Sequence, residues 1–535
     1  MRLLTLLFSV LLSTTLFAQE FSDIARATAM ADAGDRHSAI ALYESVLARH
    51  PEYEKQIVPR LARTYLWSDQ PEKSLLLFRR ALAQYPADCE LHLDYATALS
   101  WSDHLRQALS EYHDIAIICP KYNSQALLGG ARVLRWMDKL HRSDEIYAQL
   151  LADPKSKSAA EIGQVLNLQA EDRYRASRAL AEKLVSDGVK DEALYIAEAG
   201  DDVRLGNSNS ALDAIDATPQ AFASNRQLTD LRDFLERRDN PSIDTHSLVF
   251  HDRDGTSYVS SENSFRAANR DGSFTVGQGI SRLFGDTVQS AEGDVVGDWT
   301  SVSADHRFNE TLFLSARATD TRFQNVGFAP ITGELNAVIT PADLLRIDLS
   351  AARILVADNY QALAHHLDGT FVSAGADIPV ANDWTVTGAI DYTHWNEGNN
   401  RIRYRFRPAY RIEGRPRITV SLPVLFQTYD RPFSFNLFSP RRYTEIGPAV
   451  NVFIRKWHYW NFSAYGQAGV QHQSDTDWMM MGQVRAHADR DLWRHWATSF
   501  SIGWSNSNIA SPSGFERFSV DAGLTYRFGS EKQRW

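Results

Sequence analysis

The chain has 535 residues, which exceeds the usual size of one domain, roughly 100–200 residues, so more than one compact unit is expected. Its composition is that of a folded protein, with 44% hydrophobic and 23% charged residues. No apolar run of about 20 residues follows the N-terminal segment, which excludes a helical membrane protein. The formal net charge of -10 gives no reason to expect a nucleic acid partner.

The N-terminal segment MRLLTLLFSVLLSTTLFAQE predicts a secretory signal peptide over residues 1–18. Arg2 precedes a short apolar stretch, and small residues lead to Ala18, after which cleavage is expected. An anchor helix is the alternative, which the shortness of the apolar stretch disfavours. In a secreted chain Cys89 and Cys119 are either a bridged pair or two buried thiols, and two cysteines are too few for a metal cage.

Between about residues 21 and 154 the sequence repeats with a period of 34 or 35 residues, as in ARTYLWSDQ from 62, ATALSWSDH from 96 and ARVLRWMDK from 131. Prolines close successive units, with an aromatic residue seven or eight positions before each. These pairs are Tyr43 and Pro51, Phe78 and Pro86, Tyr112 and Pro120, and Tyr147 and Pro154. The period is that of the tetratricopeptide family, in which helix pairs stack into an array. Residues 155–238 predict two degenerate units or a cap, so residues 19–240 are expected to form an all-α tetratricopeptide solenoid.

Each of three repeats places a tryptophan at the end of its first helix and an aspartate at the start of its second. The tryptophans are Trp67, Trp101 and Trp136, and the aspartates are Asp69, Asp103 and Asp138. We expect the aspartates to accept backbone N–H groups at the helix start, since Asp69 and Glu72 have capping-box spacing. The tryptophans either pack in the turn between helices or form a ladder of ring faces on which sugar rings stack.

Near Asn240 the hydrophobic period changes from 3.6 to 2. RIRYRFR, residues 401–407, puts three apolar side chains on one face and four arginines on the other. About sixteen such strands lie between Thr245 and Phe528, with short turns alternating with longer loops, and the last strand, DAGLTYRF, resembles the C-terminal signal of outer-membrane barrels. These features predict an antiparallel transmembrane β-barrel over residues 245–535, wide enough for an aqueous pore and joined to the array by a short polar linker.

A signal peptide, repeats with an A-x-x-L-x-W helix end and a C-terminal barrel together resemble the outer-membrane exporters of biofilm exopolysaccharides. The poly-N-acetylglucosamine and cellulose exporters are the most similar families, and LFSPRRY, residues 437–443, is similar to a loop of cellulose-exporter barrels. The resemblance implies a monomeric, porin-like channel among the lipids of the bacterial outer membrane, with its repeats in the periplasm. A secreted polysaccharide would pass through it without bond chemistry, cofactor or metal. A periplasmic protein, such as a polysaccharide-modifying enzyme, would dock on the array.

The residues expected to face the lumen carry charge. They are Arg401, Arg403, Arg405, Arg407, Asp377 and Asp391. They form either a salt-bridge lattice that braces the wall or contacts to an anionic or hydroxyl-rich polymer, because arginine presents paired donors.

Two other functions compete with export. A surface receptor or adhesin scaffold would use the array to recruit a periplasmic partner. An enzyme barrel would need a nucleophile near its rim, and no such motif surrounds His365 and His366 in a predicted outer loop. The sequence leaves open whether a loop plugs the lumen.

Overall fold

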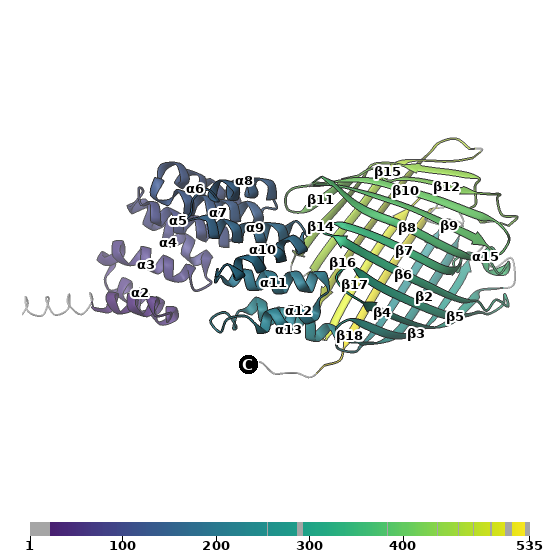
Figure 1. Ribbon diagram of the computed structural model, residues 1–535, viewed down its shortest axis with the longest axis horizontal. Coiled ribbons are helices and arrows are strands. Elements are labelled where there is room, and N and C mark those ends of the chain that lie inside the picture. Colours follow the sequence, from purple (N-terminus) through teal and green to yellow (C-terminus); the bar gives the residue numbers. More distant parts are fainter. Residues whose placement is uncertain are drawn as a thin grey trace, which may run out of the picture. The chain divides into compact units, whose positions relative to one another are not determined.

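The computed structural model describes residues 22–529, apart from 254, 286–292, 382, 436, 458–459, 475, 493–494 and 509–515. The chain divides into two compact units, Met1–Ala170 and Glu171–Trp535 (Figure 1). The predicted signal peptide lies outside the described residues. In the part of the chain that the structure describes, no helix combines the length and the apolar character that a membrane crossing requires.

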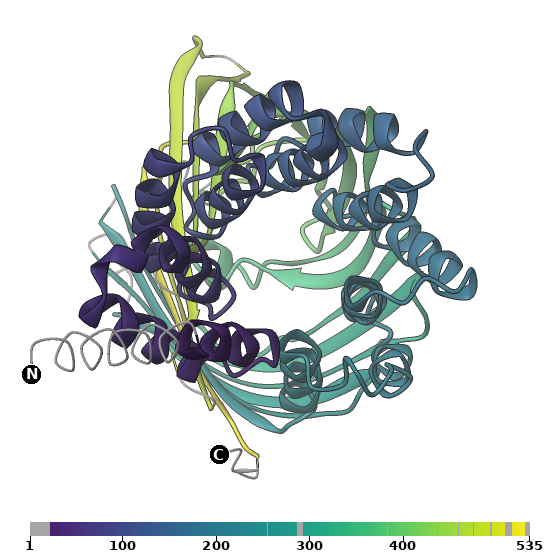
Figure 2. The same cartoon turned by 90° about the vertical axis from the view of Figure 1, so that its left-hand side faces the viewer.

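The described part of the first unit is built from helices that pack against their neighbours in chain order (Figure 2). A helix over residues 22–32 is followed by α2 (Arg36–Arg49), η1 (Pro51–Tyr53), α3 (Glu54–Leu66), α4 (Pro71–Gln84), α5 (Cys89–Trp101), α6 (Leu105–Ile118), η2 (Pro120–Tyr122), α7 (Asn123–Trp136), α8 (Leu140–Leu150) and α9 (Lys157–Ala170). The predicted tetratricopeptide array is therefore confirmed.

The repeated residues make the core of this array. The aromatic positions Tyr43, Phe78, Tyr112 and Tyr147 are at most 3% exposed. Small residues give these rings room. A Cβ atom on Gly129 would lie 2.4 Å from the Tyr112 ring, and one on Gly163 would lie 2.2 Å from the Tyr147 ring. Helix pairs can approach closely only where such small residues face the large ones.

The aspartates at the turns are not the N-cap residues of the helices that follow them, so that prediction was wrong. The N-cap residues of α4, α6 and α8 are Gln70, His104 and Lys139, and none of them caps through its side chain. The aspartate before each has a left-handed backbone, with φ of 58° at Asp69, 60° at Asp103 and 57° at Asp138.

The same turn contains glycine elsewhere in the chain. Gly34 and Gly206 have φ of 89° and 81°, and in every case the next N–H group reaches back to the helix that has just ended. At Asp103 this is the His104 N–H to the Leu99 carbonyl, at 2.9 Å. Aspartate thus takes the position of the glycine that usually ends such a helix, because it tolerates the left-handed region better than most residues.

Replacing Asp103 by glycine is expected to stabilise the array by about 0.5–1 kcal/mol, because glycine adopts a positive φ without strain. Asp103→Val should destabilise it by about 1–2 kcal/mol, because a branched Cβ is disfavoured there. Thermal unfolding of the full chain, followed by the helical circular dichroism signal, measures both effects. A lower transition temperature for the glycine variant would show that the aspartate side chain itself stabilises the turn.

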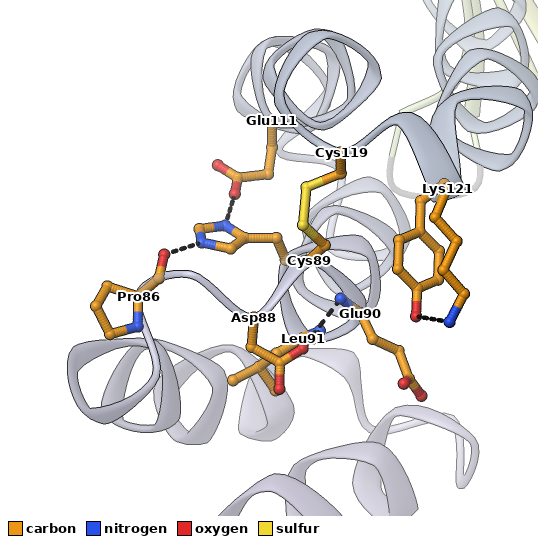
Figure 3. The surroundings of a disulfide bond; sticks show 10 residues. Pro86, Asp88, Cys89, Glu90, Leu91, Glu111, Cys119 and Lys121 are labelled. Carbon is orange, nitrogen blue, oxygen red and sulfur yellow. Dashed lines mark hydrogen bonds and ion pairs between the residues drawn. A yellow bond between two sulfur atoms is a disulfide. The ribbon is translucent and has the colours of Figure 1, made fainter.

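Cys89 and Cys119 form a disulfide (Figure 3). Of the two alternatives, a bridged pair and two buried thiols, the bridged pair is therefore correct. Cys89 is the first residue of α5, and Cys119 directly follows α6. Beside the bridge, the Asp88 carboxylate accepts the N–H groups of Glu90 and Leu91, each at 3.1 Å. The bond therefore joins the open ends of one helix pair.

Breaking this bridge is expected to lower the free energy of unfolding of the first unit by about 3–4 kcal/mol, because the bond closes a loop with a sequence separation of 30. Cys89→Ser should lower the temperature of the helical transition. Reductant should do the same to the native chain and have no further effect on the variant. A native transition that is insensitive to reductant would contradict this expectation.

The second unit begins with helices that dock on the barrel. They are α10 (Tyr174–Ser186), α11 (Glu192–Leu205), α12 (Ser208–Asp216) and α13 (Arg226–Arg238). Asp343, in a barrel turn, accepts the N–H groups of Arg175 and Ala176 at the start of α10, each at 3.0 Å. A carboxylate at a helix N-terminus is favourable because it meets unpaired N–H groups and the positive end of the helix dipole.

An ion-pair cluster strengthens this docking. Arg178 of α10 lies 2.6 Å from both Asp202 of α11 and Glu310 of a second barrel turn. Burial favours the neutral form of Glu310, but the bonds from Arg178 and Asn207 outweigh it and hold the pKa of that carboxyl below its ordinary value. The last helices are thus fixed to the barrel within one compact unit.

The rest of the second unit is one antiparallel sheet. Its strands are β1 (Ser242–Asp252), β2 (Thr256–Ala268), β3 (Gly272–Gly285), β4 (Val295–Arg307), β5 (Leu312–Phe323), β6 (Ile331–Ala342), β7 (Leu345–Leu355), β8 (Asp368–Ala381), β9 (Trp384–Trp395), β10 (Asn400–Ile412), β11 (Arg417–Ser421), β12 (Val424–Tyr429), β13 (Arg442–Ile446), β14 (Ala449–Trp457), β15 (Trp460–Gln473), β16 (Met479–Asp491), β17 (Trp496–Ser505) and β18 (Arg517–Arg527). β1 pairs with both β2 and β18, so the sheet is closed.

The eighteen labelled strands make sixteen strands of the wall. β11 and β12 pair with β10 in the same register, so they are two parts of one strand. The strand pairing is interrupted between them at Pro423, which has no N–H group to donate. β13 and β14 likewise continue each other in register across Gly447 and Pro448. The described strands therefore confirm the prediction of about sixteen, and closure leaves no unpaired edge.

The outer face of this barrel is apolar. Its exposed side chains include Phe265, Phe274, Ile280, Leu335, Val380, Trp384, Phe406, Val484 and Phe500, all at least 45% exposed. Soluble proteins rarely expose so much apolar surface, whereas a barrel that meets lipid must. This is a transmembrane β-barrel of the outer-membrane type.

The two ends of the barrel differ. The helix end carries α10–α13 and has short turns, such as residues 269–271, 343–344 and 413–416. The loop end, which includes the short helix α15 (Tyr360–Ala364), has longer connections such as residues 356–367 and 430–441 (Figure 1). The predicted alternation is confirmed. One of the short turns was expected at DRD, residues 489–491, but these residues are the end of β16 and the turn follows them.

Candidate functional site

The inner face of the barrel is identified by contacts that skip strands. Glu262 of β2 is 2.8 Å from Arg317 of β5, with two strands between them. Such a distance is possible only on the concave side, where side chains converge. Register pairs continue this face from Arg317 through β6, β7, β8 and β9 to Arg401 of β10. Because paired residues share a face, Arg401 and its alternate neighbours face the lumen.

The arginine ladder, which consists of Arg401, Arg403, Arg405 and Arg407, lies along β10 as the sequence predicted. Three of its members converge on one carboxylate. The Asp391 side chain is fully buried, and its oxygens lie 3.5 Å from Arg401, 3.0 Å from Arg403 and 3.3 Å from Arg405. The ion-pair lattice that we considered from the sequence is therefore present.

The ladder becomes more accessible along the strand. The Arg401 and Arg403 side chains are 13% and 20% exposed, whereas that of Arg405 is 47% exposed. Arg407 donates to the Thr387 hydroxyl at 3.0 Å, and that hydroxyl donates to Asp377 at 2.5 Å. The structure thus places both predicted aspartates beside the ladder, with Asp377 connected through a threonine.

The mouth segment, residues 356–367 between β7 and β8, lies across the loop end of the lumen. Its Asp358 is 2.8 Å from Arg517 of β18, and six strands of the wall separate β7 from β18. Arg517 also lies over the Phe250 ring, 3.7 Å from its centre. The segment therefore reaches from its own strands to nearly the opposite wall.

Apolar contacts hold the mouth segment on both sides. Leu363 is 1% exposed and belongs to a cluster with inward-facing side chains of β3, β4 and β5, namely Leu283, Val295 and Phe323. Ala362 and Leu367 are fully buried in a second cluster with Trp395 and Tyr429 of β9 and β12. Side chains of the 430–441 loop, including Phe433 and Leu437, pack against this second cluster.

The two loop histidines are part of this packing. His365 stacks on Phe435 at 4.2 Å between ring centres, and His366 stacks on Phe328 at 4.9 Å. The His366 ring also contacts the Val326 carbonyl at 2.8 Å. Their observed partners are thus aromatic rings and a backbone carbonyl, which hold the mouth segment in place.

A cavity of about 490 Å³ lies in the inner wall beside the mouth segment. We call it the wall cavity; its lining includes Tyr258, Glu262, Trp299, Arg317, Thr319, Thr332, Glu334 and Phe371. It combines aromatic rings with carboxylates, hydroxyls and the guanidinium groups of Arg317 and Arg353. Sites for small ligands in proteins have this mixture of apolar surface and a few fixed polar groups.

Sequence reasoning missed the wall cavity. Period-2 patterning shows that Glu262, Trp299 and Arg317 are candidates for one face, but they are far apart in the chain. Only the register of four strands brings them together, and Gly279 leaves space that a Cβ would fill, 2.1 Å from the Trp299 ring. The alternating glycines of GQGI, residues 277–280, were the one feature of the sequence that indicated space for a large side chain or a ligand on this face.

The repeat tryptophans lie at helix ends in the first unit. Trp67 follows α3, and Trp101 and Trp136 are the last residues of α5 and α7. Trp67 is 52% exposed and Trp101 is 38% exposed, and their rings meet edge to face at 5.3 Å. Trp136 is half-buried beneath Arg132, 5.8 Å from its ring. The first two rings keep large exposed surfaces.

No protein-family model and no curated protein match this sequence. Among solved structures, one described as a bacterial polysaccharide outer membrane secretin aligns with 54% of this chain and 99% of its own, at 12% identity and a TM-score of 0.44. A tetratricopeptide repeat protein from Parabacteroides merdae aligns with 40% of this chain and 84% of its own, at 17% identity and a TM-score of 0.33. CdiB from Acinetobacter baumannii aligns with 54% of this chain and 60% of its own, at 9% identity and a TM-score of 0.33. None of these similarities assigns a function to the chain.

Proposed function

We propose that this protein is an outer-membrane pore through which a secreted polysaccharide leaves the cell, without a bond being made or broken. The observation that carries the proposal is the sixteen-strand barrel with an apolar outer face and a charged, hydroxyl-bearing inner face. A barrel of this size is wide enough for an aqueous channel. A polar wall offers many weak contacts that admit a hydrated chain and release it again.

The repeats complete the proposed path. The helix end of the barrel faces the periplasm, because barrels of this type have short periplasmic turns and long external loops. Helices α10–α13 are fixed to those short turns, so the array lies on the same side of the membrane. A stacked array presents an extended surface for a partner. Exposed Trp67 and Trp101 suit either sugar rings or a periplasmic protein such as a polysaccharide-modifying enzyme.

The arginine ladder has two parts in this proposal. Arg401, Arg403 and Asp391 brace the wall, since they are mostly buried in one lattice. Arg405 and Arg407 present guanidinium groups to the lumen, where a passing polymer would meet them. Arginine is suited to this role because its planar donors bind carboxylate or hydroxyl oxygens in pairs.

A second function is favoured by the mouth segment. A surface receptor or adhesin scaffold needs no open channel, and residues 356–367 lie across the lumen. Export requires this segment to move, whereas a receptor requires it to stay. Conductance of the purified native chain in a planar bilayer separates the two, because channel openings occur only if the segment moves.

Deletion of the gene tests the export proposal directly. The deleted strain should lose surface polysaccharide and accumulate it in the periplasm, and the native gene should restore secretion. A strain that expresses a variant lacking residues 22–154, which removes the four repeats but keeps the barrel, serves as a control for barrel insertion. Unchanged secretion with no periplasmic accumulation after complete deletion would refute export.

A further inference from the structure

We propose that the wall cavity binds an uncharged sugar unit. On the basis of the proposed function, this sugar is one unit of the exported polymer, which the cavity holds beside the mouth segment. The cavity is inside the barrel, in the wall formed by β2 to β8. Its volume of about 490 Å³ is within the range of roughly 300–1,000 Å³ found for small-ligand sites.

Glu262 is a fixed hydrogen-bond acceptor in this cavity. It accepts from the Trp299 indole N–H at 3.0 Å, from the Ser301 hydroxyl at 3.2 Å and from Arg317 at 2.8 Å. Three partners from two strands hold the carboxylate in one orientation. A site arranged before binding loses little conformational freedom when a ligand enters.

Further polar groups remain for the ligand. The Glu334 side chain is exposed and accepts from the Asn336 amide at 2.9 Å. Thr319 and Thr332 face each other across β5 and β6 and contribute two hydroxyls to the lining. A carboxylate with remaining acceptor capacity and two hydroxyls match a ligand rich in hydroxyl groups, which donate and accept equally well.

The aromatic rings of the cavity match the apolar face of a sugar. Tyr258, Trp299 and Phe371 line the same space. A hexose ring has an apolar face of C–H groups and a rim of hydroxyls, so it can cover a ring while its hydroxyls reach the carboxylates. A lipid chain would leave the carboxylates unpaired, which is costly away from water.

The charges of the lining select against acidic sugars. The lining contains two carboxylates, Glu262 and Glu334, and two guanidinium groups, Arg317 and Arg353. Arg317 is paired with Glu262 at 2.8 Å and Arg353 with Asp368 at 2.9 Å, whereas the partner of Glu334 is the neutral Asn336 amide. Because both arginines are already paired with carboxylates, a carboxylate on the ligand would be repelled by Glu334. This argument concerns the wall cavity alone, since the arginine ladder lies on other strands.

The position of the cavity links binding to the mouth segment. Leu355 and Ala357 also line it, and Asp358, which holds the segment to Arg517, is the next residue. A sugar unit in the cavity would touch the base of the segment that crosses the lumen.

Isothermal titration calorimetry on the purified full chain in an uncharged detergent tests this site, with maltotriose as the uncharged probe and trigalacturonate as the acidic one. We expect maltotriose to bind at least tenfold more tightly than trigalacturonate. Thr332→Trp fills the cavity and should weaken maltotriose binding at least tenfold. Glu334→Gln should weaken it severalfold.

Val338→Trp is the matched control, because it places the same ring on the same lumen face of β6 but outside the lining. It should leave maltotriose affinity within twofold of the native value. Folding of each variant is verified by its resistance to unfolding in detergent gels. Absence of maltotriose binding, equal loss in both tryptophan variants, or tighter binding of trigalacturonate would overturn the proposal. If gene deletion abolishes secretion but the purified chain does not bind maltotriose, the cavity site is refuted and export is not. If the chain binds maltotriose but gene deletion leaves secretion unchanged, export is refuted and the cavity site is not.

Discussion

Replacing Asp391 by alanine is expected to lower the free energy of unfolding of the barrel by about 3–5 kcal/mol. The Asp391 side chain is completely buried and is the shared partner of Arg401, Arg403 and Arg405. Its loss would leave three guanidinium groups close together with no carboxylate between them, two of them mostly buried. Urea unfolding of the purified chain in detergent micelles, followed by tryptophan fluorescence, measures the change.

Asp348→Ala is the control for this effect. Asp348 also faces the lumen and pairs with an arginine, Arg346, at 2.7 Å, but both side chains are about half exposed. An exposed ion pair contributes roughly 0–1 kcal/mol, so this variant should be nearly as stable as the native chain. Equal, small losses for the two variants would show that the lattice on β10 does not brace the wall.

Shortening the mouth segment is expected to raise the single-channel conductance of the barrel severalfold. Replacing residues 358–366 by two glycine–serine pairs removes both the Asp358 anchor and α15, and with them the contacts that cross the lumen. The strands β7 and β8 remain joined, and closure of the sheet does not depend on the segment. Current through single barrels in a planar lipid bilayer is the measurement.

A point variant refines this experiment. Asp358→Asn weakens the ion pair with Arg517 and should make brief openings more frequent without changing the fully open conductance. Asp320→Asn, on the outer face of β5, serves as its control and should behave as the native chain does. If the shortened variant conducts no more than the native chain, then the mouth segment is not what limits flow.

Much of the fold was predictable because each half has a strong period. The 34-residue repeat predicted the helix pairs, and alternation predicted the strands and the lumen face of Arg401 to Arg407. The role of Asp103 was not predictable from its residue type, because aspartate both caps helices and tolerates the left-handed region. The backbone geometry of Asp103, with φ of 60°, shows that it adopts the left-handed region.

The candidate site was less predictable, for a physical reason. Alternation tells which face a residue occupies but not which strand lies opposite it in space. Glu262 and Arg317 are 55 residues apart and meet only through the register of the strands between them. The long connection at 356–367 was expected as a loop, but whether it turned outward or across the lumen depended on its contacts with Arg517 and Phe323, which the local sequence does not encode.

Release of polysaccharide from liposomes tests the central claim most directly. Liposomes containing the purified full chain would be loaded with a fluorescent dextran and a fluorescent folded protein of larger diameter. With the mouth segment shortened, the dextran should escape while the folded protein is retained, and liposomes without the chain should retain both. Retention of dextran by liposomes in which the shortened barrel is folded and inserted would contradict a pore for polysaccharide.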